Sequence, residues 1–247
     1  MLELRNVSKR FGGVVATDDV TLEVARGEVH ALIGPNGAGK TTLIAQVSGM
    51  LAVDSGRIVF EGEDITRLKA HARVRAGLAR SYQVTSIFRR FTVLENLALA
   101  VQARSGSSFS FWRPLAAETA LTDEARALAG EVGLADKLDA VAGNLAHGDQ
   151  RALEVGLALA TRPRLLLLDE PMAGMGPQES ARMIELVERL RARLTVLLVE
   201  HDMDAVFRLA NRISVLVNGR LVASGSPQAI RVDPEVRKAY LGDELAA

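Results

Sequence analysis

The sequence Gly34-Pro35-Asn36-Gly37-Ala38-Gly39-Lys40-Thr41-Thr42 lies between an apolar run that ends at Ile33 and a helical pattern that ends near Gly49. It matches the full Gly-x4-Gly-Lys-Thr pattern of a phosphate-binding loop. Glycines let backbone N–H groups curve around phosphate oxygens, and the helix that follows adds free N–H groups and the positive end of its dipole. Lys40 would place a positive charge at the β and γ phosphates, and the Thr41 hydroxyl would bind Mg²⁺. The stretch therefore predicts a nucleoside triphosphate site where a strand meets a helix.

A second motif places two carboxylates at the end of an apolar strand. The run Leu165–Leu168 is followed directly by Asp169 and Glu170. Ligands of open α/β sheets bind at the carboxyl ends of the strands, and neighbouring strand residues point to opposite sides. We therefore expect Asp169 to hold Mg²⁺, directly or through water, and Glu170 to act as general base on the attacking water. Without the phosphate-binding loop, a strand that ends in a solvated turn would explain the pair equally well.

Three further side chains are weaker candidates. His201 follows another apolar run, in Val199-Glu200-His201-Asp202, and could contact a γ-phosphate and position water or be purely structural. Gln83 could reach Mg²⁺ or water, although by pattern alone it is a surface residue. Phe11, in Lys9-Arg-Phe-Gly-Gly13, is by pattern alone an ordinary aromatic residue at a strand end. A functional role for these residues depends on the phosphate-binding loop and the two carboxylates.

Strand-like and helical patterns alternate at both ends of the chain, whereas the middle is mostly helical. The expected strands are Val20–Val24, Val29–Ile33, Ile58–Phe60, Leu165–Leu168, Thr195–Val199, Ile213–Val217 and Arg220–Ala223. The expected helices are Val93–Val101, Ala116–Val132, Pro177–Arg193, Asp202–Asn211, and a last one from Asp233-Pro234 to Gly242. Asn218-Gly219 predicts a type I′ hairpin between the last two strands. The chain therefore reads as an α/β domain with a helical insert from about Thr92 to Thr161.

Charge and composition exclude several classes of protein. The 247 residues carry 30 basic and 30 acidic side chains, whereas a general nucleic-acid binder needs a cationic surplus to neutralise phosphates. The sequence contains no cysteine, which excludes disulfides and thiolate metal sites. Its apolar runs are far shorter than the ~18–20 residues that span a bilayer, and no signal-peptide pattern opens the sequence. We expect a chain that is soluble by itself and stays in the cytosol.

The order of these motifs resembles that of the ATP-binding subunits of ABC transporters, and the resemblance covers nearly the whole chain. Three segments are most similar to the subunits of branched-chain amino acid importers: Leu145-Ala-His-Gly-Asp-Gln-Arg151, Glu200-His-Asp-Met203 and Asp233-Pro-Glu-Val-Arg-Lys-Ala-Tyr-Leu-Gly242. The resemblance implies an α/β P-loop NTPase (ABC-type ATPase) core with a mixed sheet and an inserted α-helical subdomain. It divides the chain into an ATPase core at 1–84 and 161–232, a helical subdomain with the signature loop at 85–160, and a C-terminal helix and tail at 233–247.

The resemblance implies a role for each matching residue. Phe11 would stack on adenine, Gln83 would sense Mg²⁺ and touch the membrane partner, and His201 would be the switch histidine. The catalytic set would be Glu170, His201 and Gln83, and the Mg²⁺ ligands would be Thr41, Gln83 and Asp169. ATP would be bound by Phe11, Gly34, Pro35, Asn36, Gly37, Ala38, Gly39, Lys40, Thr41 and Thr42 and, in the signature loop, by Ala146, His147 and Gly148. The signature loop would act across a head-to-tail dimer, on the ATP held by the other subunit.

Two positions depart from the usual family pattern. Ala146 and His147 stand where the signature Leu-Ser-Gly-Gly-Gln has its serine and first glycine. Because Ala146 lacks a hydroxyl for the γ-phosphate, we expect backbone N–H groups near Gly148 and at the start of the next helix to replace it. Gly176 stands where the family usually has Asp or Asn, which removes a side-chain contact between subunits. We interpret the signature as a variant form, tolerated among branched-chain importers, and not as a dead site.

The resemblance also implies partners and a location. The partners would be membrane permease subunits, a second ATP-binding subunit in a homodimer or heterodimer, and indirectly a periplasmic substrate-binding protein, with no nucleic acid. The chain would lie peripherally at the cytoplasmic side of the inner (plasma) membrane and couple ATP hydrolysis to the import of branched-chain amino acids.

Other functions also fit parts of this pattern. Urea-import and lipopolysaccharide-export ATPases share much of the pattern. A chromosome or repair ATPase of the same fold would need a long coiled coil between the phosphate-binding loop and Asp169, and the sequence there has no sustained heptads. A nucleotide-binding module without turnover is disfavoured because Glu170 and His201 are both present.

Overall fold

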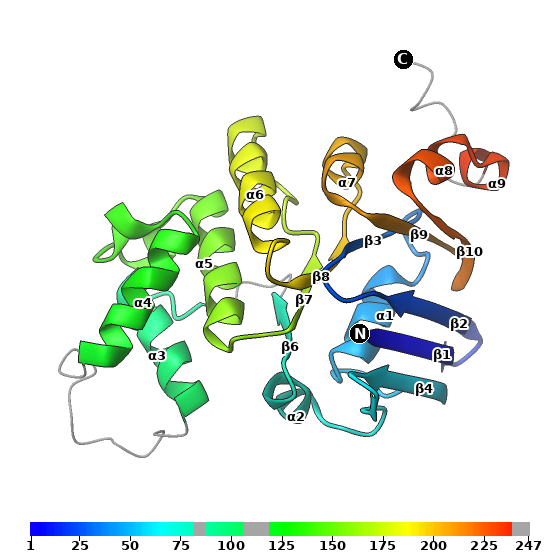
Figure 1. The fold of residues 1–247 in the computed structure, drawn as a ribbon, viewed down its shortest axis with the longest axis horizontal. Helices are drawn as coiled ribbons and strands as arrows, with labels where there is room; N and C mark the ends of the chain where they lie inside the picture. Colours follow the sequence, from blue (N-terminus) through cyan, green and yellow to red (C-terminus); the bar gives the residue numbers. More distant parts are fainter. Residues whose placement is uncertain (82–86, 106–118, 239–247) are drawn as a thin grey trace.

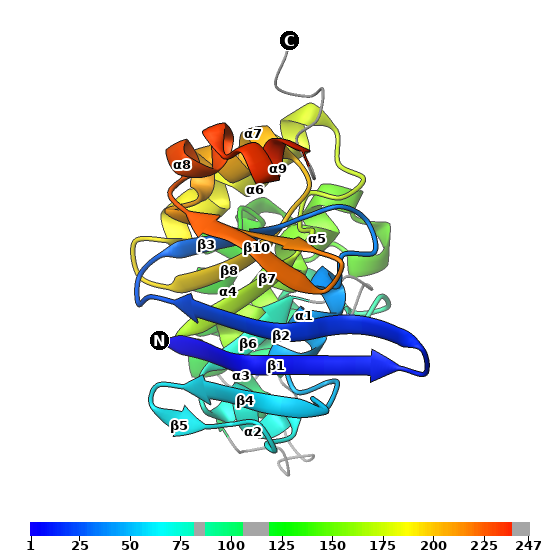
Figure 2. The ribbon, with the colours of Figure 1, turned by 90° about the vertical axis from the view of Figure 1, so that its right-hand side faces the viewer.

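The computed structural model describes residues 1–81, 87–105 and 119–238 of the chain. Two β-sheets and several helices form layers, and helix α1 (Lys40–Val47) lies between the sheets (Figures 1 and 2). Apolar side chains of α1 pack with residues from both sheets in one buried cluster. Since α1 directly follows the phosphate-binding loop, this packing fixes the loop to the centre of the molecule.

The central sheet is a mixed sheet, as the sequence predicts. Within the described residues its strands, in spatial order, are β10 (Arg220–Gly225), β9 (Arg212–Val217), β3 (Val29–Ile33), β8 (Thr195–Val199), β7 (Leu165–Asp169) and β6 (Leu78–Ser81). All neighbours are parallel except β9 and β10. Every residue of β3, β7 and β8 is buried, because α1 and the outer helices cover the two faces. Leu165 and Leu167 pack on the side of α1, and Leu166 and Leu168 pack on the outer helices.

A second, antiparallel sheet covers α1 from the other side. Its strands, in spatial order, are β2 (Val14–Val24), β1 (Leu2–Phe11), β4 (Ser55–Phe60) and β5 (Glu63–Asp64). The long hairpin of β1 and β2 pairs Phe11 with Val14 at its tip. The sequence predicts only parts of this sheet: β1 is unexpected, and β2 and β4 begin earlier than expected. The alternation of polar and apolar residues in β1 fits a sheet with one solvated face.

Helix α2 (Ala70–Arg75) anchors the far end of α1. The Arg73 side chain is buried and donates hydrogen bonds to the carbonyl oxygens of Gln46 and Val47, at 2.7 and 2.8 Å, and of Thr66, at 2.9 Å. Burial lowers the pKa of Arg73 to about 10. The last carbonyl groups of a helix have no partner within the helix, so these bonds hold α1 and the loop at its start in place.

Three helices form the predicted helical insert at one end of the molecule (Figure 1). They are α3 (Val93–Ser105), α4 (Thr119–Glu131) and α5 (His147–Ala160), with short 3-10 turns at Ala135–Lys137 and Ala142–Asn144. The remaining helices are α6 (Pro177–Leu190), α7 (Met203–Leu209), α8 (Pro227–Val232) and α9 (Pro234–Val236). The exact division into 1–84, 85–160, 161–232 and 233–247 stays a prediction.

Local signals agree with the structure where the residues are described. Asn218 and Gly219 have φ values of 48° and 80°, as a type I′ hairpin requires. The Asp233 side chain caps α9 by accepting hydrogen bonds from the N–H groups of Glu235 and Val236. Gly242, the expected end of the last helix, lies outside the described residues. Among the described helices, none has both the length and the apolar character needed to cross a bilayer.

Candidate functional site

The phosphate-binding loop connects β3 to α1 and brings its glycines close to the backbone of other strands. A Cβ atom on Gly34 would lie 2.0 Å from the carbonyl oxygen of Leu216, and one on Gly39 would lie 2.1 Å from that of Ala16. Gly39 also has a φ of 102° and is the residue before the first turn of α1, where no side chain caps the helix and no acidic residue is present. The first N–H groups of α1 are therefore suited to bind an anion.

Lys40 lies inside the loop. Its Nζ donates hydrogen bonds to the carbonyl oxygens of Gly34, at 2.6 Å, and Pro35, at 3.0 Å. Burial lowers the pKa of Lys40, and the charges of Glu170 and Asp169 act in the opposite direction. The structure therefore brings the loop lysine and both predicted carboxylates together, although their segments are about 130 residues apart in the chain.

Asp169 ends β7 with its side chain fully buried. Its Oδ2 accepts a hydrogen bond of 2.7 Å from Nη2 of Arg80 on β6. Its Oδ1 is buried, and no hydrogen bond to this atom comes from the described part of the chain. A buried carboxylate oxygen without a donor suits a hard cation, so Asp169 fits the proposed role of Mg²⁺ ligand. Sequence reasoning missed Arg80, because nothing in its local pattern indicates a partner on another strand.

Glu170 directly follows the last residue of β7 but does not continue the strand, so the alternation of neighbouring strand residues does not apply to it. Its φ is 49°, so it has left the strand conformation and begins a turn instead of continuing the pleat. Its N–H donates a 2.8 Å hydrogen bond to the carbonyl oxygen of Val199, and its carbonyl oxygen accepts one from Ala173. A left-handed conformation is unusual for glutamate and is common at functional sites.

His201 lies where β8 ends, on the strand next to β7. The exposed fraction of its side chain is 62%, which leaves the imidazole accessible to a ligand. Its backbone N–H is bound by the buried carboxylate of Glu200 at 3.0 Å. Sequence reasoning quoted Glu200 only as part of a motif and gave it no role, since burial is not visible in that pattern.

Of the two remaining candidates, the structure describes Phe11 but not Gln83. The Phe11 residue is 50% exposed, and the Lys9 ammonium lies 5.6 Å from the centroid of its ring. A half-exposed ring at a hairpin tip can stack on a ligand, and it equally fits an ordinary aromatic residue at a strand end, so the contact of Phe11 with adenine stays a prediction. Gln83 lies outside the described residues. The structure makes no statement about its proposed contact with Mg²⁺.

The signature loop is tied to the turn that follows Glu170 within the same chain. His147 shares a 3.1 Å hydrogen bond with the carbonyl oxygen of Ala173 through Nε2. The Glu179 carboxylate accepts hydrogen bonds from the N–H groups of Gly148, at 3.1 Å, and Gly176, at 3.2 Å, and these bonds lower the pKa of Glu179. Glu179 was missed from the sequence, although a glutamate three residues after a helix start is a known capping signal.

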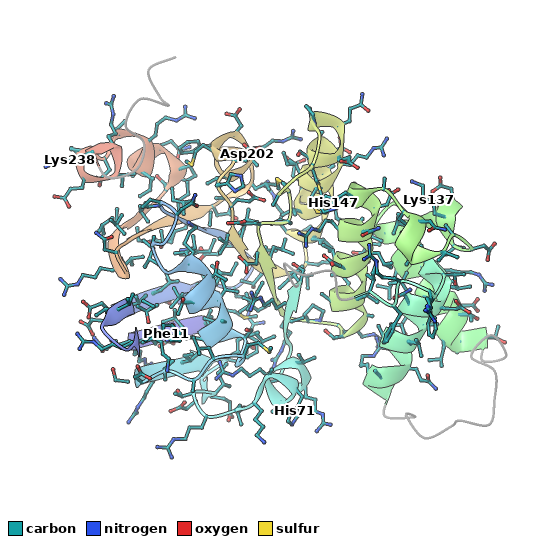
Figure 3. The ribbon with its side chains drawn as sticks, turned by 180° about the vertical axis from the view of Figure 1, so that it is seen from behind. Phe11, His71, Lys137, His147, Asp202 and Lys238 are labelled. Atoms are coloured by element: carbon teal, nitrogen blue, oxygen red, sulfur yellow. The ribbon has the colours of Figure 1, made fainter. Side chains whose placement is uncertain are left out.

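These contacts involve both segments in which the sequence departs from the family pattern, the signature loop and the loop that carries Gly176. The N–H of Gly148 is engaged by its own chain, and His147 packs against the loop that carries Gly176. Figure 3 shows Phe11 and His147 on different parts of the molecule, so one chain does not bring the two ends of the predicted nucleotide site together.

Two family models match the chain. The model described as "ABC transporter" matches residues 17–173, and the model described as "Branched-chain amino acid ATP-binding cassette transporter" matches residues 220–246.

Known proteins are similar over nearly the full length. The high-affinity branched-chain amino acid transport ATP-binding proteins BraF of Pseudomonas aeruginosa and LivG of Escherichia coli are each 38% identical, with 98% of both chains covered. The lipopolysaccharide export system ATP-binding protein LptB of Escherichia coli is 36% identical, with 99% of this chain and 98% of LptB covered.

Solved structures agree with these matches. A nucleotide-free ATP-binding cassette from an ABC transporter superposes with a TM-score of 0.86 at 30% identity, covering 98% of this chain and 99% of that one. An ATP-binding cassette in its ADP conformation gives the same TM-score at 31% identity, covering 98% of both chains.

Proposed function

Because this chain belongs to the ABC transporter ATP-binding family, we propose that it is the motor subunit of an importer for branched-chain amino acids. The chain binds and hydrolyses ATP, as members of the family do. The observation that carries the choice of cargo is the match of residues 220–246 to the branched-chain amino acid family model, together with relatives of that name at 38% identity.

We assign the chemistry to the residues around the phosphate-binding loop. Lys40 exchanges its two carbonyl partners for the β and γ phosphate oxygens when ATP binds, and Phe11 stacks on the adenine. Glu170 accepts the proton of the attacking water, and His201 contacts the γ-phosphate. Mg²⁺, held by Thr41, Asp169 and Gln83, would neutralise charge on the phosphates.

The site requires a second ATP-binding subunit. Within one chain, Phe11 and the signature-loop residue His147 lie on different parts of the molecule (Figure 3), so the signature loop of a second subunit would complete the site. A head-to-tail pair places each signature loop on the ATP of the other subunit. Glu179 already binds the N–H of Gly148, and Nε2 of His147 already donates to the carbonyl oxygen of Ala173. The other N–H groups at the start of α5 are therefore the donors that we assign to the γ-phosphate.

The chain works with membrane permeases, as the ATP-binding subunits of this family do. We further propose that it associates peripherally with the cytoplasmic side of the inner membrane and that a periplasmic binding protein delivers the cargo. Export of lipopolysaccharide is the second candidate, because LptB is 36% identical over nearly the same length.

Co-purification from native membranes tests this proposal. The import function predicts that the tagged chain brings down two permeases, an ATP-binding partner and, with the cargo present, a periplasmic binding protein. In proteoliposomes that contain this complex, leucine-loaded binding protein should raise ATP turnover, while urea and lipopolysaccharide should not. Recovery of an export permease pair, with turnover that ignores leucine, would favour the second candidate.

A further inference from the structure

Glu200 is a fully buried carboxylate that the proposed chemistry does not use. Its relative exposure is 0%, and it follows the last residue of β8. Oε1 accepts a 2.9 Å hydrogen bond from the N–H of Met172, and Oε2 accepts a 3.0 Å hydrogen bond from the N–H of His201. The backbone N–H of Asp202 also binds the carboxylate. The donors therefore belong to two different loops.

Those two loops carry the two residues to which hydrolysis is assigned. Met172 lies two residues after Glu170, and His201 directly follows Glu200. The backbone pairing of β7 with β8 ends at Asp169 and Val199, with one further bond from the N–H of Glu170. Beyond that bond the chains turn away from the sheet, and the Glu200 carboxylate continues the connection between them.

Burying the charge of the Glu200 carboxylate costs free energy unless backbone N–H groups donate hydrogen bonds to it. Burial raises the pKa of Glu200, while the backbone N–H groups and the nearby His201 lower it. The His201 Nδ1 atom lies 3.8 Å from Oε2, too far for a hydrogen bond. Removing one acceptor would leave a backbone N–H buried without a partner, so the arrangement favours one relative position of the two loops.

We infer that Glu200 is a positioning residue for ATP hydrolysis, which holds the turn after Glu170 and the backbone of His201 in a fixed relation to each other. This inference rests on the proposed roles of Glu170 and His201. Glu200 has no contact with Lys40 or with the rest of the phosphate-binding loop among the bonds that the structure gives it. Its effect is therefore expected in the turnover step and not in nucleotide affinity.

The test compares Glu200→Gln with Glu28→Gln. Glutamine keeps the shape of glutamate but replaces one acceptor oxygen with an amide group that cannot accept. Glu28 is a partly buried carboxylate that also accepts a backbone N–H, from Ala25, but it lies at the opposite end of β3 from the loop. Glu200→Gln should lower kcat by roughly 10–100-fold, the size of effect that slight misplacement of catalytic groups produces. KM and the Kd of a fluorescent ATP analogue should stay within about twofold. Glu28→Gln should leave all three nearly unchanged.

A double-mutant cycle separates positioning from general destabilisation. If Glu200 acts through Glu170, then Glu200→Gln should reduce kcat much less in a Glu170→Gln background than in the wild type. A full additional loss in that background would overturn the inference, as would a kcat for Glu200→Gln within twofold of the wild-type value. A parallel rise of KM, or an equal loss in Glu28→Gln, would also overturn it.

Hydrogen exchange on the unmodified chain gives a second measurement, which does not depend on a variant that folds. The amides of Met172 and His201 should exchange as slowly as those of β7 and β8. Exchange at the rate of exposed loops would contradict the inference. Absence of ATP turnover in the wild-type chain would instead refute the proposed function, so the two failures are distinguishable.

Discussion

Replacing Gly39 with alanine tests how tightly the sheets constrain the phosphate-binding loop. The new Cβ atom would lie 2.1 Å from the carbonyl oxygen of Ala16, and this oxygen belongs to β2, so it cannot move without the strand. Gly37 provides a matched control in the same loop. Its φ of 80° is also in the left-handed region, but a Cβ atom there would meet nothing within 4 Å.

The two substitutions share one cost and differ in the other. A left-handed conformation costs an L-residue about 1–2 kcal/mol. Forcing an atom into a packed backbone adds about 1–3 kcal/mol. Gly39→Ala should therefore lower the free energy of unfolding by about 2–5 kcal/mol and Gly37→Ala by about 1–2 kcal/mol. In a chain of this size each kcal/mol lowers Tm by roughly 2–4 °C.

Thermal unfolding without nucleotide measures this difference, and titration with fluorescent ATP measures its effect on binding. Gly39→Ala should also weaken ATP more than Gly37→Ala, because the overlap displaces the residue that precedes α1. Equal melting temperatures and affinities for the two variants would refute the reasoning, since they would show that the approach of β2 to the loop imposes no steric limit.

Three further changes test single side chains. Glu170→Gln should reduce ATP hydrolysis by ~10²–10⁴-fold and spare ATP binding, and near-normal turnover would exclude Glu170 as the base. Lys40→Ala should weaken ATP and ADP alike, by about 1.5–3 kcal/mol for each charge-assisted hydrogen bond lost, and titration with fluorescent nucleotide measures it. Phe11→Ala should weaken ATP by ~1–3 kcal/mol while Phe11→Tyr stays nearly neutral, and equal losses would indicate a packing role.

The fold could be predicted from the sequence where burial of a strand on both faces produces a continuous apolar run. Leu165–Leu168 and Thr195–Val199 are almost entirely apolar because α1 covers one face of the sheet and the outer helices cover the other. Such runs are easily recognised in a sequence. Strand β1 was missed because one of its faces is solvated and its residues mix polar with apolar. Strand β6 was missed because it spans only Leu78–Ser81.

The candidate site was predictable as far as its residues belong to local motifs. Lys40, Asp169 and Glu170 follow from spacing and from the end of a strand. Arg80 and Glu200 could not be found in this way, because each binds a residue of a distant segment. Only the fold brings the two segments of each pair together.

Restored activity in a mixture of two inactive variants tests most directly that the site is built from two chains. Lys40→Ala disables the phosphate-binding loop, and Gly148→Asp disables the signature loop, where even a Cβ atom would lie 2.8 Å from Oε1 of Glu179. Each variant alone should hydrolyse almost no ATP. Where two copies of this chain pair at random, half of the dimers contain both variants and each of these has one intact site, so the mixture should regain up to roughly a quarter of wild-type turnover. No recovery, together with a specific activity of the wild type that is independent of protein concentration, would contradict a shared site and indicate hydrolysis within one chain.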